Sequence, residues 1–522
     1  MSRTQKRILL VVMLLCIAFI SLFSFNRSYI GFGTETDYLG GFVPEARRFL
    51  RGDSLLLEFH PPLYSMVVAL VQTIVQEWFR AGLLVSLISS AIVLIANFFF
   101  FYNLLGIYAA WGTIAGLITS TQFIEYSAYA TSDIFFFALY SIALLISLLA
   151  IKRYKRYLWI LCGLAVGCLI LTRTNGITCL AIVLLPWCSR ESFRQKLNGS
   201  IYFVSGLLIP LGSWSIFAWL SGSPLKPSST YANLALTYFS SPSSNRISGD
   251  ERIQLEAQFN SLIDVIRHDP VHIIKIYYQD IMTLIGRIPR MLQDPLNIFV
   301  PIGVLALFYT EIKNRKVFIF YIFLTLIQAL LLNFKAYEAR YFLFLIAILG
   351  AILGEAFRYL INLVQSRKSR RRLIGFCGLC GCLALILSSS SAWRAVDSSV
   401  GELKDVIPKV QPLPLGQSGM IARKPHLPFY TDTQRLSFPN VETLEELGQA
   451  VGCSMKNQSE LESIFLYFGT KERLRRPQFS ALSNPETSPD WLMPIQQSSR
   501  PDLWVLYEYL PDRLSGEIAC PM

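Results

Sequence analysis

The chain has 522 residues, of which 53% are hydrophobic and only 16% are charged, and its mean hydropathy is +0.44. This composition excludes an ordinary soluble protein, because soluble domains carry about 25% charged residues and lack apolar runs long enough to cross a bilayer. The net charge of +12 does not indicate a nucleic-acid partner, because the basic residues fall in short connections between apolar runs, where they mark membrane topology.

The first element is an apolar stretch at residues 8–25, preceded by Arg3, Lys6 and Arg7. No small-residue cleavage site follows it, so the pattern predicts an uncleaved membrane span and not a removed signal peptide. The basic residues before the span predict that the amino terminus lies in the cytoplasm.

Four basic runs later in the chain must face the same side as the amino terminus: residues 152–156, 190–196, 313–316 and 367–372. A set of about eleven spans satisfies this condition. These spans are predicted at residues 8–25, 81–103, 108–124, 134–151, 157–171, 177–188, 200–219, 296–310, 317–333, 341–363 and 373–391. The sequence therefore predicts a polytopic α-helical membrane protein.

The apolar segment at residues 63–76 is not counted as a span, because a further crossing would move two of the basic runs to the outside. It follows Pro61-Pro62, which favours a helix start, and is expected to lie along the membrane interface. Residues 26–80 then form a first outer loop with interfacial helices. Residues 221–295 form a long outer loop, and residues 1–391 make up the transmembrane domain.

Residues 392–522 are soluble in composition and mix strand-like and helix-like patterns, which predicts a small α/β domain on the outer face. Eight of the ten cysteines fall in or beside spans, where they are expected to pack between helices. Cys453 and Cys520 lie in the outer domain, and an oxidising exterior permits a disulfide between them, but the sequence leaves the pairing open.

Short polar motifs follow several of the predicted spans on the outer side. The first loop contains Thr36-Asp37-Tyr38-Leu39-Gly40-Gly41, then a helix-like stretch at residues 45–53, and then His60-Pro61-Pro62-Leu63-Tyr64. Later turns contain Tyr129-Ala130-Thr131-Ser132-Asp133, Leu171-Thr172-Arg173-Thr174-Asn175-Gly176 and Glu338-Ala339-Arg340-Tyr341. The residue types that carry chemistry therefore share one predicted face.

The order of these motifs over roughly residues 1–390 resembles the C-type glycosyltransferase superfamily, in particular its polyprenyl-phosphate-sugar branch. That branch includes protein O-mannosyltransferases and lipid A aminoarabinose transferases. The resemblance implies an enzyme of the plasma (inner) membrane that takes a sugar from a polyprenyl phosphate to a lipid, glycan or protein acceptor. One departure is Asp37-Tyr38, where protein O-mannosyltransferases typically carry an Asp-Glu pair, which puts a protein-mannosylating role in doubt.

The chemistry of this reaction needs few groups. The leaving phosphate is already a stable anion, so its departure needs charge stabilisation, whereas the acceptor hydroxyl must lose a proton as it attacks the anomeric carbon. Asp37 is the expected base, by its position outside the first span and by analogy with the family, and attack opposite the phosphate would invert the anomeric centre. Asp133 is expected to orient the acceptor or the sugar, although Ser132 or Asp133 capping the next helix needs no function.

The expected binding site for the donor phosphate combines Arg173, Lys335, Arg340, Tyr341 and His60. Cationic side chains at the membrane boundary pair with a lipid phosphate, but they also reach toward headgroups without any specific ligand, and for Lys335 both interpretations stay open. His60 either binds the phosphate or positions the interfacial helix. Glu125 is a weaker acidic candidate.

Two other functional classes remain as alternatives. A flippase for lipid-linked sugars would also have many spans, but charged residues in mid-span, which mark substrate paths, are nearly absent. A scaffold whose outer domain binds partners would tolerate loss of Asp37. No spacing resembles a metal site and no cofactor is expected, although the sequence leaves a metal requirement, the sugar and the acceptor open.

Overall fold

The computed structural model describes most of the chain. The described residues are 2–57, 60–189, 191–225, 234–235, 238–239, 258–259, 261–309, 315–333, 338–413, 415, 417–439, 441–458, 460–499, 504–514 and 520. The chain forms two compact units. The helical unit comprises Met1–Ser28, Gly41–Tyr238 and Ser261–Val396, and the C-terminal unit comprises Tyr29–Gly40, Phe239–Asn260 and Asp397–Met522.

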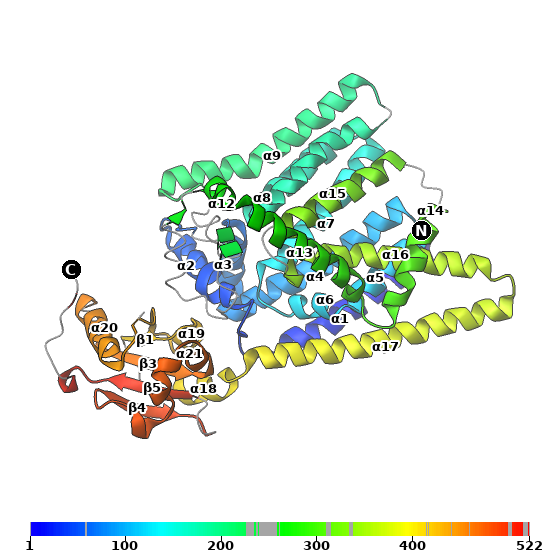
Figure 1. Cartoon of the computed structure of the whole chain (residues 1–522). Coiled ribbons are helices and arrows are strands. Elements are labelled where there is room, and N and C mark those ends of the chain that lie inside the picture. Colours follow the sequence, from blue (N-terminus) through cyan, green and yellow to red (C-terminus); the bar gives the residue numbers. More distant parts are fainter. Residues whose placement is uncertain are drawn as a thin grey trace. The chain divides into compact units, whose positions relative to one another are not determined.

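Seven helices among the described residues are long and apolar enough to cross a bilayer (Figure 1). They are α1 (Arg3–Phe25), α4 (Trp78–Leu104), α7 (Ser132–Arg153), α9 (Phe193–Ser221), α15 (Arg315–Asn333), α16 (Leu343–Leu363) with the short η5 (Ala339–Phe342) before it, and α17 (Arg367–Val400). A bent pair, Pro270–Met291 and Leu296–Phe308, would make an eighth span. It contains α13 (Pro270–Arg287), η3 (Ile288–Met291), η4 (Leu296–Phe299) and α14 (Val300–Phe308).

Three further predicted spans coincide with shorter apolar helices, namely α5 (Ile107–Ile118), α8 (Arg156–Thr172) and η2 (Thr174–Cys188). The weakest of these predictions, at residues 177–188, falls on η2, which is a 3₁₀ helix of 15 residues. Because a 3₁₀ helix rises about 2.0 Å per residue, such a segment reaches about 30 Å, the thickness of a hydrocarbon core. The tighter winding explains how so short an apolar run can reach the length of a span.

The predicted helices of the first loop are present. After the π-helical turn η1 (Tyr38–Phe42) come α2 (Val43–Arg51) and α3 (Leu63–Val75), and α3 begins directly after Pro62, as the paired prolines predict. One face of α3 is buried, whereas Leu70 and Ile74 are largely exposed. An exposed apolar stripe of this kind suits a helix that lies in the membrane interface.

Glycines bring the helices of the helical unit into close contact. A Cβ atom on Gly112 of α5 would lie 2.3 Å from the carbonyl oxygen of Gly350 in α16, and one on Gly163 of α8 would lie 1.9 Å from that of Phe203 in α9. Small residues at such crossings let helix backbones approach directly, which is how helices associate in membranes. These contacts fix α8 and α16, whose ends carry two of the expected site residues.

The C-terminal unit is built on a mixed sheet. Its described residues include five strands in the order β2-β1-β3-β5-β4, with β1 parallel to β2 and β3 and the remaining pairs antiparallel. The strands are β1 (Ser418–Ile421), β2 (Gln434–Leu436), β3 (Ser463–Gly469), β4 (Leu492–Gln497) and β5 (Trp504–Tyr509). The helices are α18 (Leu403–Val410), α19 (His426–Thr431), α20 (Leu444–Asn457) and α21 (Thr470–Arg475). The small α/β domain predicted from the sequence is therefore present.

Both faces of this sheet are covered. Along the central strand β3, Ile464, Leu466 and Phe468 enter one apolar cluster, and Phe465 and Tyr467 enter the other. This alternation is what a strand buried on both sides requires. A disulfide joins Cys453 to Cys520, which answers the question that the sequence left open.

The C-terminal unit also contains a short segment from near the amino terminus, residues 29–40. The backbone N–H of Ile30 donates to the Tyr430 hydroxyl (2.7 Å), and that of Phe32 donates to the carbonyl of Ser399 (2.6 Å). The Tyr29 and Phe32 side chains pack against the apolar cluster that includes Leu403. The chain thus enters the C-terminal unit after α1 and leaves it just before α2.

Candidate active site

The start of α7 places Asp133 in a nearly solvent-free position. The N-cap of this helix is Thr131, and not Ser132 or Asp133. The Thr131 hydroxyl accepts a hydrogen bond from the backbone N–H of Asp133 (3.4 Å). The same hydroxyl donates to Asp133 Oδ2 (2.6 Å). Asp133 is therefore held in the first turn, where its charge complements the helix dipole, and it is free of the capping role considered from the sequence.

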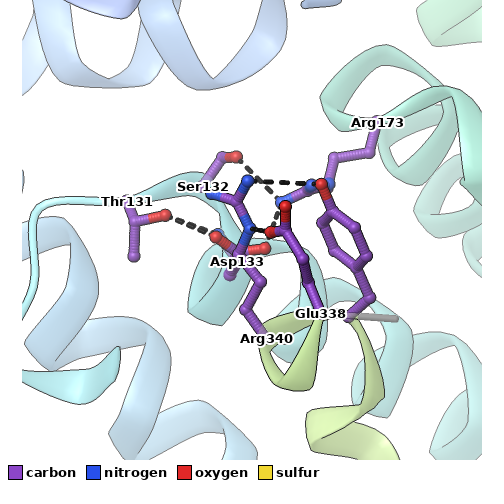
Figure 2. A network of polar contacts seen from close by, with 7 residues as sticks. Thr131, Ser132, Asp133, Arg173, Glu338 and Arg340 are labelled. Carbon is purple, nitrogen blue, oxygen red and sulfur yellow. Dashed lines mark hydrogen bonds and ion pairs between the residues drawn. The ribbon is translucent and has the colours of Figure 1, made fainter. Parts of the chain in front are cut away.

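Arg173 lies opposite Asp133, at the residue where α8 ends. Its guanidinium forms an ion pair with Asp133 Oδ1 and donates a hydrogen bond to Ser132 Oγ (3.4 Å), as Figure 2 shows. The side chains of Arg173 and Asp133 are only 11% and 3% exposed. Because water hardly reaches them, each charge is stabilised by the other and not by solvent.

Arg340 reaches the same cluster from the turn before α16. It forms an ion pair with Glu338 and donates to the Tyr341 hydroxyl (3.3 Å). The guanidinium carbons of Arg173 and Arg340 both lie 5.0 Å from the centroid of the Tyr341 ring. The aromatic ring is thus shared by two cations, and both belong to one polar network with Asp133 and Glu338 (Figure 2).

A small cavity adjoins this network. Asp133, Arg173, Arg340, Tyr341 and Asn175 supply its polar lining. The rest of its wall is aromatic or aliphatic, from Phe136, Phe137, Tyr140, Leu343 and Phe344. Anion-binding side chains and an apolar wall therefore meet in one place.

The structure brings some expected site residues together and leaves others apart. Asp133, Arg173, Arg340 and Tyr341 line one cavity, and His60, which stacks on Phe42 with ring centroids 4.4 Å apart, interacts electrostatically with Asp133. The weaker candidate Glu125 lies on α6 (Thr121–Ser127) and is not among the residues that line the cavity. Lys335 falls outside the described residues.

Asp37 belongs to the C-terminal unit and is half-buried at the end of the segment 29–40. It lies in a turn in which its backbone N–H donates to the Thr34 carbonyl (3.4 Å) and that of Tyr38 donates to the Glu35 carbonyl (3.0 Å). The π-helical turn η1 begins at the next residue. Such turns are rare and frequently occur at functional sites.

The sequence analysis assigned no role to several residues of the polar network and its cavity, among them Glu338, Tyr140 and Phe344. Glu338 was part of a quoted motif, but its pairing with Arg340 was not foreseen. Tyr140 lies seven residues after Asp133, two helical turns along the same face of α7, and Phe344 lies three residues after Tyr341. Helical spacing from the named residues is the signal that would have found both.

The described residues contain no group of three or more His, Cys, Asp or Glu side chains arranged to hold a metal ion. The acidic members of the network, Asp133 and Glu338, are each paired with an arginine. The arrangement is therefore suited to binding an anion, and the expected donor phosphate is of that chemical class.

Residues 59–219 match the family of dolichyl-phosphate-mannose-protein mannosyltransferases. No curated protein sequence is significantly similar to this chain. Among the solved structures that share its fold are two of low sequence identity. ArnT from Cupriavidus metallidurans in the apo state has 13% identity and a TM-score of 0.55, and the match covers 98% of this chain and 99% of that one.

The second structure is the archaeal oligosaccharyltransferase AglB from Archaeoglobus fulgidus, in complex with an inhibitory peptide and a dolichol-phosphate. It has 12% identity and a TM-score of 0.54, and the match covers 89% of this chain and 70% of that one. The family match over residues 59–219 and the shared fold confirm the resemblance to C-type glycosyltransferases and the polytopic membrane architecture. They do not favour the flippase alternative.

Proposed function

We propose that this chain, a C-type glycosyltransferase by its fold and by the family match over residues 59–219, transfers a sugar from a polyprenyl phosphate to an acceptor hydroxyl with inversion. One observation carries the proposal. Two arginines share one aromatic ring beside a cavity whose remaining wall is largely apolar. A lipid phosphate needs both features, cations for the headgroup and hydrocarbon for the first isoprene units.

The two arginines suit a phosphate that leaves during the reaction. Arg173 is oriented by Asp133, and Arg340 is oriented by Glu338. Both guanidinium groups are therefore already in position before the donor binds. Each guanidinium has five N–H donors, which is enough to bind its carboxylate and a phosphate together. Tyr341 and His60 complete the proposed phosphate site, together with Lys335.

The proposed reaction has a single displacement step. Asp37 takes the proton of the acceptor hydroxyl, the hydroxyl oxygen forms a bond to the anomeric carbon, and the bond from that carbon to the phosphate oxygen breaks. The electron pair stays on the phosphate, which leaves as the polyprenyl phosphate anion while Arg173 and Arg340 stabilise its charge. Asp133 is proposed to orient the acceptor or the sugar.

The proposal also includes a location. The four basic runs support a cytoplasmic amino terminus in the plasma (inner) membrane, and the disulfide between Cys453 and Cys520 supports an extracytoplasmic C-terminal unit, because disulfides persist in oxidising compartments. A fusion of alkaline phosphatase to the carboxyl terminus is expected to be active in cells. A fusion that is inactive there, although it is stably produced, would contradict this orientation.

The test of the activity uses purified full-length protein, undecaprenyl-phosphate monosaccharides labelled in the sugar, and acceptor membranes from cells that lack the protein. The wild type is expected to convert label on prenyl phosphate, which mild acid releases, into glycosidic label that resists mild acid. Because the protein is in detergent and separates no compartments, a flippase would give no product in this assay.

Two variants separate the proposed roles. Asp37→Asn is expected to bind undecaprenyl phosphate like the wild type but to lose transfer by about 10²-fold or more, since a positioned base contributes about 10²–10⁴-fold. Arg173→Gln is expected to weaken the binding of undecaprenyl phosphate. Wild-type turnover in Asp37→Asn would rule out the base, and unchanged lipid binding in Arg173→Gln would rule out the phosphate site.

A further inference from the structure

The turn that carries Asp37 is fixed by residues from the far end of the chain. Within the C-terminal unit, the carbonyl of Gly31 accepts a hydrogen bond from Nε2 of His426 (2.9 Å). A Cβ atom at Gly31 would lie 2.2 Å from Oγ of Ser399, so only glycine allows the segment 29–40 to pass this closely. The segment is therefore anchored at its beginning, several residues before Asp37.

Lys424, between β1 and α19, is the contact at the other end of the segment. Its Nζ donates a hydrogen bond to Oγ1 of Thr36 (3.3 Å), and its side chain is half-buried. Asp37 is the acidic side chain that favours the charged form of Lys424. The ammonium group thus interacts with both residues of the Thr36-Asp37 pair, by a hydrogen bond to one and by its charge with the other.

We propose that Lys424 is a positioning residue for the catalytic base, holding the Thr36-Asp37 turn in place so that the Asp37 carboxylate keeps one orientation toward the acceptor hydroxyl. This inference rests on the proposed function, in which Asp37 is the base. A carboxylate that must meet a substrate proton at hydrogen-bond distance loses rate steeply when it is misplaced by about 1 Å. The half-buried ammonium group of Lys424, which donates a hydrogen bond to the neighbouring Thr36, limits that movement.

Lys424 is also the group whose charge changes in the alkaline range. Burial, together with the charges of the nearby Arg423, Arg475 and Arg435, lowers its pKa to about 8, although Asp37 acts in the opposite direction and raises it. The hydrogen bond and the attraction to Asp37 are therefore strongest below pH 8 and weaken as Lys424 loses its proton. An arginine at this position would stay charged throughout.

Glu472 and His426, which face Lys424, change charge at lower pH, and burial raises the pKa of Tyr467 well above its usual value. Lys424, Glu402, Glu472 and His426 line one small cavity of the C-terminal unit. Burial raises the pKa of Glu472 to about 7 and lowers that of His426 to about 4. Glu402 accepts hydrogen bonds from the Tyr467 hydroxyl (2.8 Å) and the Thr470 N–H (3.1 Å). A loss of activity centred near pH 8 therefore points to Lys424.

The contact can be tested without any assay of transfer. Reductive methylation of the full-length protein over pH 6–11, read for Lys424 by mass spectrometry, gives the pH at which this amine becomes reactive. Wild type is expected to show a midpoint near 8, and Asp37→Asn to lower it by on the order of one pH unit, because the favourable charge is gone. Asp397→Asn, which removes the partner of Lys404, is the control and is expected to leave Lys424 unchanged. An unchanged midpoint in Asp37→Asn would overturn the inference.

The role in catalysis is tested by kinetics on the same proteins. Lys424→Met is expected to lower kcat roughly tenfold at pH 7 with the donor KM unchanged. Lys424→Arg is expected to keep most of kcat and to move the alkaline loss of activity from about pH 8 to well above it. Lys404→Met, an exposed lysine of the same unit, is expected to behave like wild type.

The outcomes distinguish the two proposals. If wild type shows no transfer with any donor, the proposed function fails, while the methylation result still decides whether Asp37 and Lys424 interact. If wild type transfers sugar and Lys424→Met retains its kcat and pH profile, the positioning role is wrong. If Lys424→Met does not fold, Lys424→Arg decides the matter, because an alkaline limb that stays near pH 8 in this variant would assign the limb to another group.

Discussion

The ion pair between Asp133 and Arg173 is the most buried pair of opposite charges at the candidate active site. Removing one partner of such a pair leaves the other charge without water and without a counterion, which costs about 3–5 kcal/mol. An exposed pair contributes about 0–1 kcal/mol, because water and salt screen it. Burial therefore decides what a substitution at this site does to stability.

We expect Asp133→Asn to lower the free energy of unfolding by about 3 kcal/mol, because Arg173 then stays buried without its carboxylate. The double variant Asp133→Asn with Arg173→Gln is expected to recover part of this loss. Arg80→Gln is the control, since its pair with Glu77 is about half exposed on both sides. Thermal unfolding in detergent is measured for these three variants, for Arg173→Gln and for the wild type, and additive losses in the double variant would contradict the coupling.

Two buried groups of the C-terminal unit give its stability opposing dependences on pH. Burial raises the pKa of Glu472 from 4.5 to about 7, so its contribution to stability is complete below pH 4.5 and is lost as the pH rises to 7. Burial lowers the pKa of His426 from 6.5 to about 4, so its contribution is present above pH 6.5 and is lost as the pH falls to 4. The pH ranges over which the two contributions change therefore nearly coincide, and the changes have opposite signs.

We therefore expect the unfolding free energy of the wild-type C-terminal unit to change little between pH 4.5 and 6.5. A variant that lacks one of the two groups is expected to show the pH dependence that the other group causes. Glu472→Gln should gain stability with rising pH, and His426→Gln should lose it, each by about 3 kcal/mol across the window. Pulse proteolysis of the full-length protein in urea, read on C-terminal peptides, gives these values. Slopes of the same sign in both variants would show that the two shifts are misassigned.

At this scale the sequence identified much of the network and little of its detail. Asp133, Arg173 and Arg340 were named because each is an ionisable residue at the predicted end of an apolar run, and they line one cavity. Their catalytic and binding roles stay predictions. The cap at Thr131 and the pairing of Glu338 with Arg340 depend on side-chain directions in two turns, which residue types alone do not specify.

At the scale of elements, the positions of the site residues depend on how closely helices approach. Arg340 precedes α16, and α16 crosses α5 where Gly112 faces Gly350 and Gly354. The nearest atoms there are backbone atoms, which cannot move aside as a flexible side chain would. A single methyl group at this crossing must therefore separate the two helices.

We expect Gly112→Ala to lower the free energy of unfolding by about 1–3 kcal/mol and to weaken the binding of undecaprenyl phosphate, because α16 moves together with Arg340. Gly375→Ala in α17 is the matched control, since nothing lies within 4 Å of a Cβ atom there. Thermal unfolding and lipid binding are measured on both variants. Destabilisation without any change in binding would show that α16 does not determine the geometry of the phosphate site.

The sequence predicted the helical elements well, because a long apolar run between basic loops has few alternatives in a membrane. Each of the eleven predicted spans coincides with helical segments, although three fall on helices shorter than an ordinary span. The predicted span at residues 296–310 coincides only with the second member of the pair that is bent by 106°. The 3₁₀ winding of η2 was not foreseen. Apolar content does not distinguish a 3₁₀ helix from an α-helix, because the two differ in their hydrogen bonds and not in their hydrophobicity.

At the scale of the whole molecule, the sequence predicted the C-terminal α/β domain but not that residues 29–40 pack within it. Local patterns report contacts between residues a few positions apart, whereas Gly31 and His426 are separated by 395 positions. The residues that make these contacts, such as Gly31 and Lys424, had no assigned role in the sequence. Their meaning depends on a tertiary contact, which periodicity does not encode.

The anchoring of residues 29–40 has a consequence for biosynthesis. A ribosome makes Asp37 early and Lys424 only after most of the polypeptide has been made. During most of translation, the proposed base therefore lacks the contact with Lys424. On this view the base acquires its positioning contact only after residue 424 has been made, and a polypeptide truncated before that residue would carry Asp37 without it.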